Sequence, residues 1–353
     1  MLVDCHVHVN AFLPANGRTS RALLGRPSFR YLRWRLGMKG ADGETERALV
    51  AALAAELDGA REVDAAVILA FDAVYGDDGR LDDERTHLHV ENDYVIELVR
   101  QNPKMLFGAS VHPYRRDALV ELERCAAAGA VLLKWLPITQ GMNPADPRCF
   151  PLYEALAHLG IPLLAHTGGE KTLPNIDIGV ADPALLLPAL ERGVTVIAAH
   201  CGTRSAPGEA CFVDTFVRMA KEHERFYGDT SALNLPTRAY AYWRILDDPA
   251  VRSKLVHGSD WPIPPIPMPG NHGWRGAAAL LRERNALRRD VAIKRALGLT
   301  EADYWERAAT LFPARAQAAR SRQKVAQPPS AISAAPAATS TAPGMRVDAS
   351  GSP

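Results

Sequence analysis

VDCHVHV, at residues 3–9, is an apolar run in which His6 and His8 lie two positions apart. Side chains two positions apart on a strand point to the same face, so these two histidines can converge on one ion. Three later apolar runs end in His166, His200 and Asp260, and they read IPLLAHTGG (161–169), VTVIAAHCG (194–202) and KLVHGSDWP (254–262). Imidazole and carboxylate groups are ligands that zinc and related metals use in proteins. Four strand ends of this kind predict a metal site to which several strands contribute.

Apolar runs alternate with amphipathic segments along most of the chain. Eight strands are predicted, at Leu2–Val9, Ala65–Phe71, Met105–His112, Val131–Leu136, Pro162–His166, Val194–His200, Phe226–Asp229 and Leu255–Asp260. Helices are predicted between most of them, and strands that alternate with helices pair in parallel through right-handed crossovers. The strands are rich in Val, Ile, Leu and Ala, as is usual where helices cover both faces. We therefore expect an α/β fold, a (β/α)8 TIM barrel, over residues 1–315.

Two segments depart from a minimal barrel. Residues 11–43 follow the first strand and form a basic stretch that contains Tyr31 and Trp34. We predict an inserted segment at the catalytic end, and we favour packing on the barrel over a direct role in substrate binding. Residues 316–353 are rich in Ala, Pro and Ser and poor in large apolar side chains. Such a tail cannot bury enough surface to offset its ordering entropy, so we predict that it is disordered.

Composition and charge narrow the functional class. Of the 353 residues 47% are hydrophobic and 23% are charged, as in an ordinary soluble enzyme. A formal net charge of +1 gives no general attraction to nucleic acid or to acidic membranes. The chain has no apolar run of the ~18 residues that a membrane span needs, and it enters its first strand without room for a secretory signal. The 5 cysteines form no C-x-x-C pair, so we expect reduced thiols and a cytoplasmic location.

The sequence resembles the amidohydrolase superfamily, and more closely its branch of metal-dependent, amidohydrolase-related TIM-barrel proteins, which includes hydrolases and decarboxylases. The resemblance rests on seven motifs in a fixed order, DCHVHV, GASVHP, LLKWLP, LLAHTGG, AAHCG, YGDTS and HGSDWP. It implies a metal held by His6, His8, His166 and Asp260. It also implies that His200 is either a further ligand or an acid/base residue.

The chemistry of a bound metal gives these positions roles. A divalent ion with an open coordination position lowers the pKa of bound water to about 7. Asp260 could ligate the ion, accept the proton of that water and deliver it to a leaving amine or alkoxide. His200 could polarise the substrate carbonyl or bind a second ion. Zinc is the first expectation, although histidine and aspartate also suit manganese, iron and nickel.

Lys134, at the end of the run AVLLKWLP, bears on the number of metal ions. Superfamily members with two metals often carry a carbamylated lysine at this strand end, and the carbamate bridges the ions. Carbamylation needs a neutral amine, hence a pKa that burial and nearby cations lower. The alternative is an ammonium group that binds a substrate carboxylate. We favour the ammonium, and therefore one ion over two.

Further residues are candidates for contact with the substrate. His112 follows the third strand and either faces the catalytic end or is a hydrogen-bonded structural histidine. Arg204, just after His200, could bind an anionic substrate or lie at the surface. Trp261 begins a proline-rich loop and could form a wall of the substrate pocket or pack within a rigid lid.

Two acidic residues are weaker candidates. Asp229, in YGDTS, is predicted to orient His200 or Asp260, or else to cap the next helix together with Thr230. Glu170 follows the LLAHTGG motif, and we interpret it as a solvated loop charge rather than as a pocket residue.

The function that these patterns favour is metal-dependent hydrolysis of an amide, ester or lactone bond in a small molecule. The alternative within the same superfamily is a metal-dependent decarboxylase of a small carboxylic acid. A third possibility is a non-catalytic barrel that acts as a binding module. Loss of metal ligands from the sequence would indicate such a barrel. The chain retains every expected ligand. We expect a small-molecule substrate as the partner, with no nucleic acid and no membrane, and we leave a homo-oligomer open.

Overall fold

Eight parallel strands form the centre of the computed structural model, which describes residues 1–313. They are β1 (Val3–His8), β3 (Ala65–Leu69), β5 (Met105–Ala109), β6 (Leu132–Trp135), β7 (Leu163–His166), β8 (Val196–Ala199), β9 (Phe226–Asp229) and β10 (Leu255–Val256). Neighbours in the sheet follow one another in this order. The eight predicted strands and their parallel pairing are therefore confirmed. The tail predicted over residues 316–353 and the boundary at residue 315 lie outside the described residues.

The first strand also lies beside the segment that follows the last strand. The backbone N–H of His8 donates to the carbonyl of Trp261 at 2.8 Å, and the N–H of Asp260 donates to the carbonyl of His6 at 2.9 Å. The sheet therefore curls until its two edges meet. The carboxyl ends of all eight strands then share one rim, where barrels of this kind carry their active sites.

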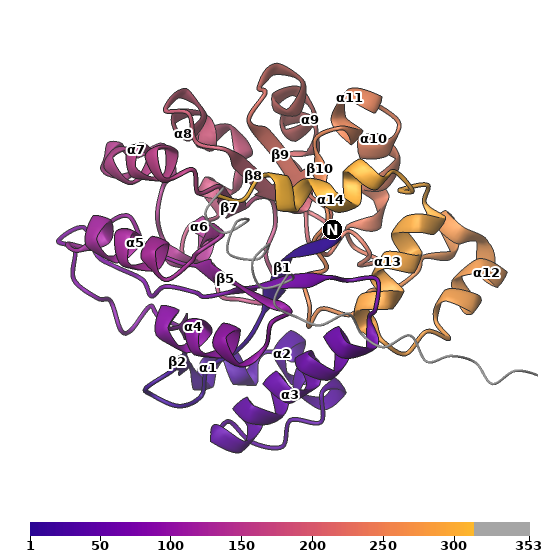
Figure 1. Ribbon diagram of the computed structural model, residues 1–353, viewed down its shortest axis with the longest axis horizontal. Coiled ribbons are helices and arrows are strands. Elements are labelled where there is room, and N and C mark those ends of the chain that lie inside the picture. The colour runs from indigo at the N-terminus through magenta and orange to yellow at the C-terminus, as the bar shows by residue number, and fades with distance from the viewer. Residues whose placement is uncertain (314–353) are drawn as a thin grey trace, which may run out of the picture.

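Helices surround the curled sheet (Figure 1). They are α3 (Gly43–Gly59), α4 (Asn92–Gln101), α5 (Ala118–Ala127), α6 (Pro137–Gln140), α7 (Phe150–Leu159), α8 (Leu187–Glu191), α9 (Val213–Glu222), α10 (Tyr242–Leu246), α11 (Pro249–Arg252), α12 (Pro269–Leu280), α13 (Ala286–Ala296) and α14 (Ala302–Thr310). Among residues 1–313, none combines the length and the apolar character that crossing a membrane requires.

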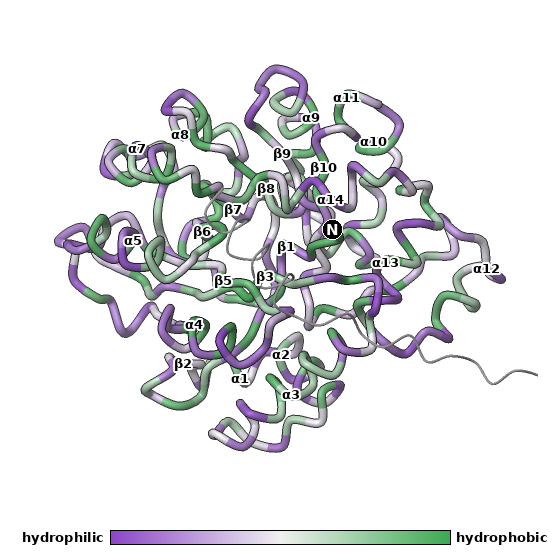
Figure 2. Tube along the Cα trace, viewed as in Figure 1, coloured by the Kyte–Doolittle hydropathy of each residue, from purple (hydrophilic) through white to green (hydrophobic). Residues whose placement is uncertain are grey.

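Two buried clusters form the core, one on each face of the sheet. The larger lies between the strands and the surrounding helices, and it includes Leu53 of α3 and Leu156 of α7. The smaller joins alternate strand residues such as Val67 and Leu164 to Phe312, just after α14. Figure 2 shows hydrophobic residues along the central strands and hydrophilic residues along much of the periphery. Burial on both faces explains why the strands read as apolar runs.

The chain between β1 and α3 folds into β2 (Gly17–Thr19), α1 (Arg21–Gly25) and α2 (Pro27–Arg35). Strand β2 pairs with β4 (Leu88–Val90) in a separate antiparallel sheet. Phe29 and Leu32 of α2 are buried, whereas Trp34 on the same helix is 77% exposed. Helix α2 therefore presents one apolar face to the body of the protein. That residues 11–43 are an insertion stays a prediction.

Several strands end before the predicted residue, and three of these differences concern candidate site residues. Strand β5 ends at Ala109, before His112, and β8 ends at Ala199, before His200. Strand β10 ends at Val256, four residues before Asp260. His200 and Asp260 have φ values of 63° and 65°. This is the left-handed region, which a strand cannot contain, so both side chains lie in tight turns that follow their strands.

Candidate active site

Three of the predicted ligands lie close enough together to bind one ion. His6, His8 and Asp260 each offer one ligand atom, and these atoms all lie within 4.8 Å of one another. The Nε2 atoms of the two histidines are 3.0 Å apart. Asp260 Oδ1 lies 3.4 Å from Nε2 of His6 and 3.3 Å from Nε2 of His8. Two imidazole nitrogens and a carboxylate oxygen are a donor set of the kind that catalytic zinc sites use.

Asp229, at the end of β9, fixes the ring of His6. Its Oδ2 lies 2.6 Å from His6 Nδ1. Burial, followed by the charge of Lys134, lowers the pKa of His6 well below its usual value, so the ring is neutral and carries its proton on Nδ1. His6 Nε2 therefore presents a lone pair to His8 and Asp260, and metal-binding histidines are generally held in this way. The site thus fits a divalent metal ion.

Asp229 orients a different residue from those predicted. The ring that it orients is that of His6, whereas it was expected to orient His200 or Asp260. Its other oxygen, Oδ1, accepts the backbone N–H of His200 at 2.8 Å. Asp229 therefore joins β1 to the turn after β8, which the sequence alone does not indicate.

Among the contacts of residues 1–313, only one ring nitrogen of His200 has a hydrogen-bond partner. Its Nδ1 lies 2.9 Å from the carbonyl oxygen of Ser231 and 2.8 Å from the Ser231 hydroxyl. A carbonyl can only accept, so this contact places the proton on Nδ1 and leaves a lone pair on Nε2. Burial and then the charge of Arg238 lower the pKa of His200 well below its usual value. In this state His200 can accept a proton or bind a metal, but it cannot donate a hydrogen bond from Nε2 to a carbonyl.

His166 lies beside His200 rather than within the group of three ligands. The centroids of the two rings are 4.7 Å apart. His166 Nε2 lies 3.2 Å from the carbonyl oxygen of Gly169, and Nδ1 lies 4.0 Å from Glu170 Oε2. A role for His166 or His200 as a metal ligand stays a prediction.

Lys134 is fully buried, beneath the predicted ligands. Its Nζ lies 3.1 Å from Nε2 of His6, so the amine and a metal ion compete for the same lone pair. Burial lowers the pKa of Lys134 to about 8, although the charges of Asp229 and Asp260 oppose this shift. A part of the lysine population is therefore neutral near neutral pH, as carbamylation requires.

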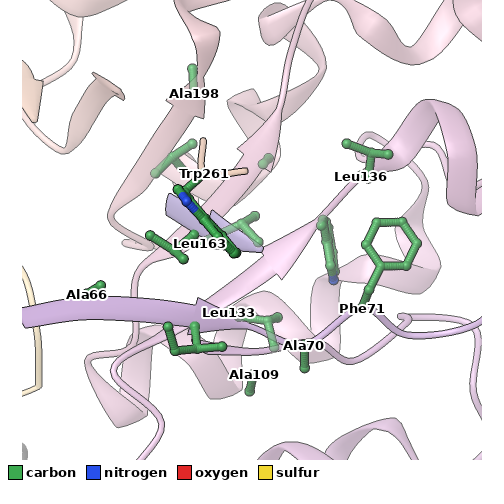
Figure 3. Close-up of a cluster of buried hydrophobic side chains, with 14 of the residues drawn as sticks. Ala66, Ala70, Phe71, Ala109, Leu133, Leu136, Leu163, Ala198 and Trp261 are labelled. Atoms are coloured by element: carbon green, nitrogen blue, oxygen red, sulfur yellow. The ribbon is translucent and has the colours of Figure 1, made fainter. Parts of the chain in front are cut away.

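The side chains of the other predicted substrate contacts are engaged elsewhere in the protein. Both ring nitrogens of His112 are hydrogen-bonded to backbone groups at 3.1 Å. The guanidinium of Arg204 lies 4.7 Å from the centre of the Tyr240 ring. Trp261 is 1% exposed and belongs to the larger core cluster (Figure 3). None of these three predicted contacts lines the cavity described next.

A cavity of about 610 Å³, counting the space at its mouth, opens at the carboxyl rim. His8, His166, His200 and Asp260 form its polar side. Its apolar side includes Phe29, Leu32, Phe71, Leu88, Leu136 and Leu173. The cavity therefore brings four of the five predicted ligands to a space that can hold a small molecule.

Sequence reasoning missed several residues of this site. Glu170 lines the cavity and is not a solvated loop charge. Ser231 holds Nδ1 of His200, a contact that the YGDTS motif does not indicate. Buried Arg238 donates to the carbonyl of Thr203 at 2.8 Å and to that of Gly169 at 2.7 Å, which ties together the loops after β7 and β8. No local pattern in the sequence marks Arg238, because its partners lie in distant loops.

Fold and site together define a TIM-barrel protein with a candidate metal centre at the carboxyl ends of its strands. A family model narrows this class. The model Amidohydro_2, described as Amidohydrolase, matches residues 3–315. The chain therefore belongs to this amidohydrolase family, as the motifs predicted. No curated protein sequence matches the chain.

Solved structures agree with the fold. An uncharacterized TIM-barrel protein from Bordetella bronchiseptica has a TM-score of 0.54 at 17% identity, covering 84% of this chain and 99% of its own. A probable 2-pyrone-4,6-dicarboxylic acid hydrolase from Acinetobacter baumannii, solved with citric acid bound, has a TM-score of 0.52 at 16% identity. That comparison covers 90% of this chain and 98% of the hydrolase. At these identities the likeness supports the TIM-barrel fold and not a substrate.

Proposed function

We propose that this protein is a metal-dependent hydrolase that cleaves an amide, ester or lactone bond in a small molecule. The observation that supports this proposal is the convergence of His6, His8 and Asp260 beside a cavity that His200 also lines. The retained ligands argue against a barrel that serves only as a binding module. Membership of the amidohydrolase family agrees with a metal-dependent enzyme.

The residues of the chain divide the work of hydrolysis. A divalent ion held by His6, His8 and Asp260 would supply a Lewis acid that polarises the substrate carbonyl and acidifies water. Burial opposes ionisation of Asp260, but the hydrogen bond from His8 and the charge of Lys134 help to outweigh burial, so the pKa of Asp260 is lowered. Asp260 is therefore a carboxylate that can accept a proton. His200 Nε2 accepts a hydrogen bond from the attacking water and so orients it.

Every bond and proton is accounted for in the proposed hydrolysis. The water oxygen bonds to the carbonyl carbon while one water proton passes to Asp260. The bond from that carbon to the amide nitrogen or ester oxygen then breaks, and the leaving atom takes the proton from Asp260. The products are a carboxylic acid and an amine or alcohol. A lactone gives both groups on one molecule.

The lining of the cavity favours hydrolysis over decarboxylation. A decarboxylase must bind a substrate carboxylate, and lysine or arginine side chains commonly do so. Of the residues that the structure describes, no lysine or arginine lines the cavity. Lys134 is fully buried beside His6. Decarboxylation therefore ranks second.

Metal content and turnover test this proposal together. The full chain is treated with a chelator, reloaded with zinc or manganese, and assayed on aryl esters, lactones and anilides, with CO2 release from aromatic acids measured in parallel. We expect hydrolysis that depends on the metal and that Asp260→Asn lowers by about 10²-fold or more. Release of CO2 without hydrolysis of any test compound would support the decarboxylase instead.

Elemental analysis of wild type and Lys134→Ala decides the number of ions. We propose one ion per chain in both proteins, with zinc as the first candidate. Two ions in wild type, falling to one or none in the variant, would instead mean a carbamylated lysine that bridges a binuclear centre.

A further inference from the structure

The cavity has two chemically different sides. Its polar side carries the candidate metal ligands, and its other side is built from aliphatic and aromatic side chains. Phe29 and Leu32 come from α2, in the segment after β1. Phe71 and Leu136, which Figure 3 labels, follow β3 and β6. Leu88 of β4 completes this apolar wall. A ligand that reaches the metal ligands must therefore place part of its surface against hydrocarbon.

The charges that reach the cavity are negative. Asp260 lies on the polar side and Glu170 on the loop after β7. Glu170 Oε1 accepts the backbone N–H of Leu173 at 3.0 Å and that of Thr172, so its carboxylate is held at the cavity by its own loop. Once a divalent ion offsets the charge of Asp260, Glu170 remains as a negative charge that disfavours an anion in its part of the cavity.

No cationic side chain compensates for these carboxylates at the wall. Within residues 1–313, neither lysine nor arginine is among the lining residues. The nearest buried cations are already engaged: Lys134 faces His6, and Arg238 donates to the backbone of Thr203 and Gly169. An anionic group at the apolar wall would lose its hydration without gaining a partner, which is costly.

We infer that the substrate is an uncharged ester, lactone or amide whose aromatic or branched apolar group lies against the wall formed by Phe29, Leu32, Phe71 and Leu88. This inference rests on the proposed hydrolase function and adds the class of substrate. The wall selects an apolar group because contact removes apolar surface of both partners from water. The carboxylate of Glu170, and the lack of lysine and arginine among the lining residues that the structure describes, disfavour substrates that carry a second, anionic group.

Leu32 is the specificity-determining residue best suited to a test. It lines the cavity and is 8% exposed, yet it lies outside the larger core cluster that contains Phe29 and Phe71. A change at Leu32 therefore disturbs the wall more than the core. Trp34, on the same helix, is 77% exposed and does not line the cavity, so Trp34→Arg is a matched control for Leu32→Arg.

Binding to the chelator-treated full chain tests the wall independently of catalysis. Butyrophenone and benzoylpropionate are two unreactive ketones of similar shape, and the second carries a carboxylate. We expect wild type and Trp34→Arg to bind butyrophenone at least about tenfold more tightly by calorimetry. Leu32→Arg should reduce or reverse this ratio, since its guanidinium can pair with the carboxylate. Equal or tighter binding of benzoylpropionate by wild type would overturn the inference.

Turnover by the metal-loaded chain separates this inference from the proposed function. Phenyl butyrate and monophenyl succinate are matched esters, uncharged and anionic. We expect wild type to prefer phenyl butyrate in kcat/KM by at least about tenfold and Leu32→Arg to lose that preference. Selective ketone binding without hydrolysis of any ester would contradict the hydrolase while supporting the apolar site. Hydrolysis that favours monophenyl succinate would contradict the substrate class alone.

A circular dichroism spectrum of each variant establishes that it is folded. If Leu32→Arg does not fold, Leu32→Ala takes its place. This variant removes wall contacts without adding a charge, and it should weaken butyrophenone binding.

Discussion

His200 and His112 are both buried histidines that follow a strand, yet their surroundings differ. His112 has hydrogen bonds to backbone groups at both ring nitrogens. His200 anchors only Nδ1, on Ser231, and its ring lines the cavity. A fully satisfied ring fixes the fold, whereas a ring with one free lone pair can still bind a proton or a metal. The rim therefore has a scaffolding half around β3, β5 and β6 and a reactive half around β1, β8, β9 and β10.

Backbone conformation separates the same two halves. In the described part of the chain, the non-glycine residues with positive φ are His200, Cys201, Ala232 and Asp260. All four follow β8, β9 or β10, on the reactive half. Each such conformation costs on the order of 1 kcal/mol, and it persists where the surrounding structure over-determines it. The reactive half is therefore held in an arrangement that local preference alone would not select.

The largest expected effect is the loss of metal from the reactive half. His8→Ala removes one of three converging ligand atoms without emptying the core, since His8 is only partly buried. We expect the variant to fold and to lose the ion, as measured by elemental analysis after gentle purification. His112→Gln, on the scaffolding half, should keep the ion. Full metal content in His8→Ala would show that the ligand assignment is wrong.

Exchanging the two histidines for asparagine gives the next largest contrast. His200→Asn should lower kcat/KM by about 10²-fold, because the attacking water loses the side chain that orients it. His112→Asn should lower kcat/KM much less and reduce the free energy of unfolding instead. Steady-state kinetics together with urea unfolding of both variants make this comparison. Equal losses of kcat/KM in both would remove the distinction between the two halves.

A buried carboxylate on each half provides a third contrast. Asp229 orients His6, whereas Asp72 accepts the backbone N–H of His112 at 2.7 Å and pairs with Arg115 at 3.2 Å. Asp229→Asn should weaken metal binding by about 10–100-fold, because the ring of His6 loses its charged partner. Asp72→Asn should leave metal affinity unchanged and lower stability. Competitive titration against a metal-binding dye measures both, and unchanged affinity in Asp229→Asn would argue against the orienting role.

Much of the fold could be predicted from the sequence because its signals are local. The runs around Val67, Leu164 and Ile197 are apolar throughout, as strands covered on both faces must be. Their alternation with helices then leaves a parallel order as the simplest topology. The strand ends at His200 and Asp260 could not be predicted in this way, since tight turns set their positive φ values.

The parts of the site that depend on the spacing of residues along one strand were predicted. The parts that depend on contacts between distant segments were missed. His6 and His8 converge because they lie two positions apart on one strand. The apolar wall at Leu32 depends on how the segment after β1 folds back over the rim, which no short pattern specifies. For His112 and Trp261, the orientation of the side chain was the unknown. Hydrogen bonding turns His112 into a structural residue, and packing buries Trp261 in the core.

The last contrast is a pH dependence that belongs to the scaffolding half. Burial lowers the pKa of His112 from 6.5 to about 4. Between these values the unfolded chain binds a proton that the folded chain does not, so this contribution to stability is complete above about pH 6.5 and is lost as the pH falls towards 4. The full loss would be about 3 kcal/mol, at about 1.4 kcal/mol per pKa unit.

Comparing wild type with His112→Gln isolates this contribution, because every other titrating group is common to both proteins. Glutamine can keep a hydrogen bond to the backbone but cannot take up a proton in this range. The free energy of unfolding in urea should therefore fall less in His112→Gln than in wild type when the pH is lowered from about 7 to about 4.5. Parallel pH profiles would mean that His112 titrates alike in the folded and unfolded chains. In that case burial would not hold the ring of His112 neutral, and the boundary between scaffolding and reactive halves would have to be drawn elsewhere.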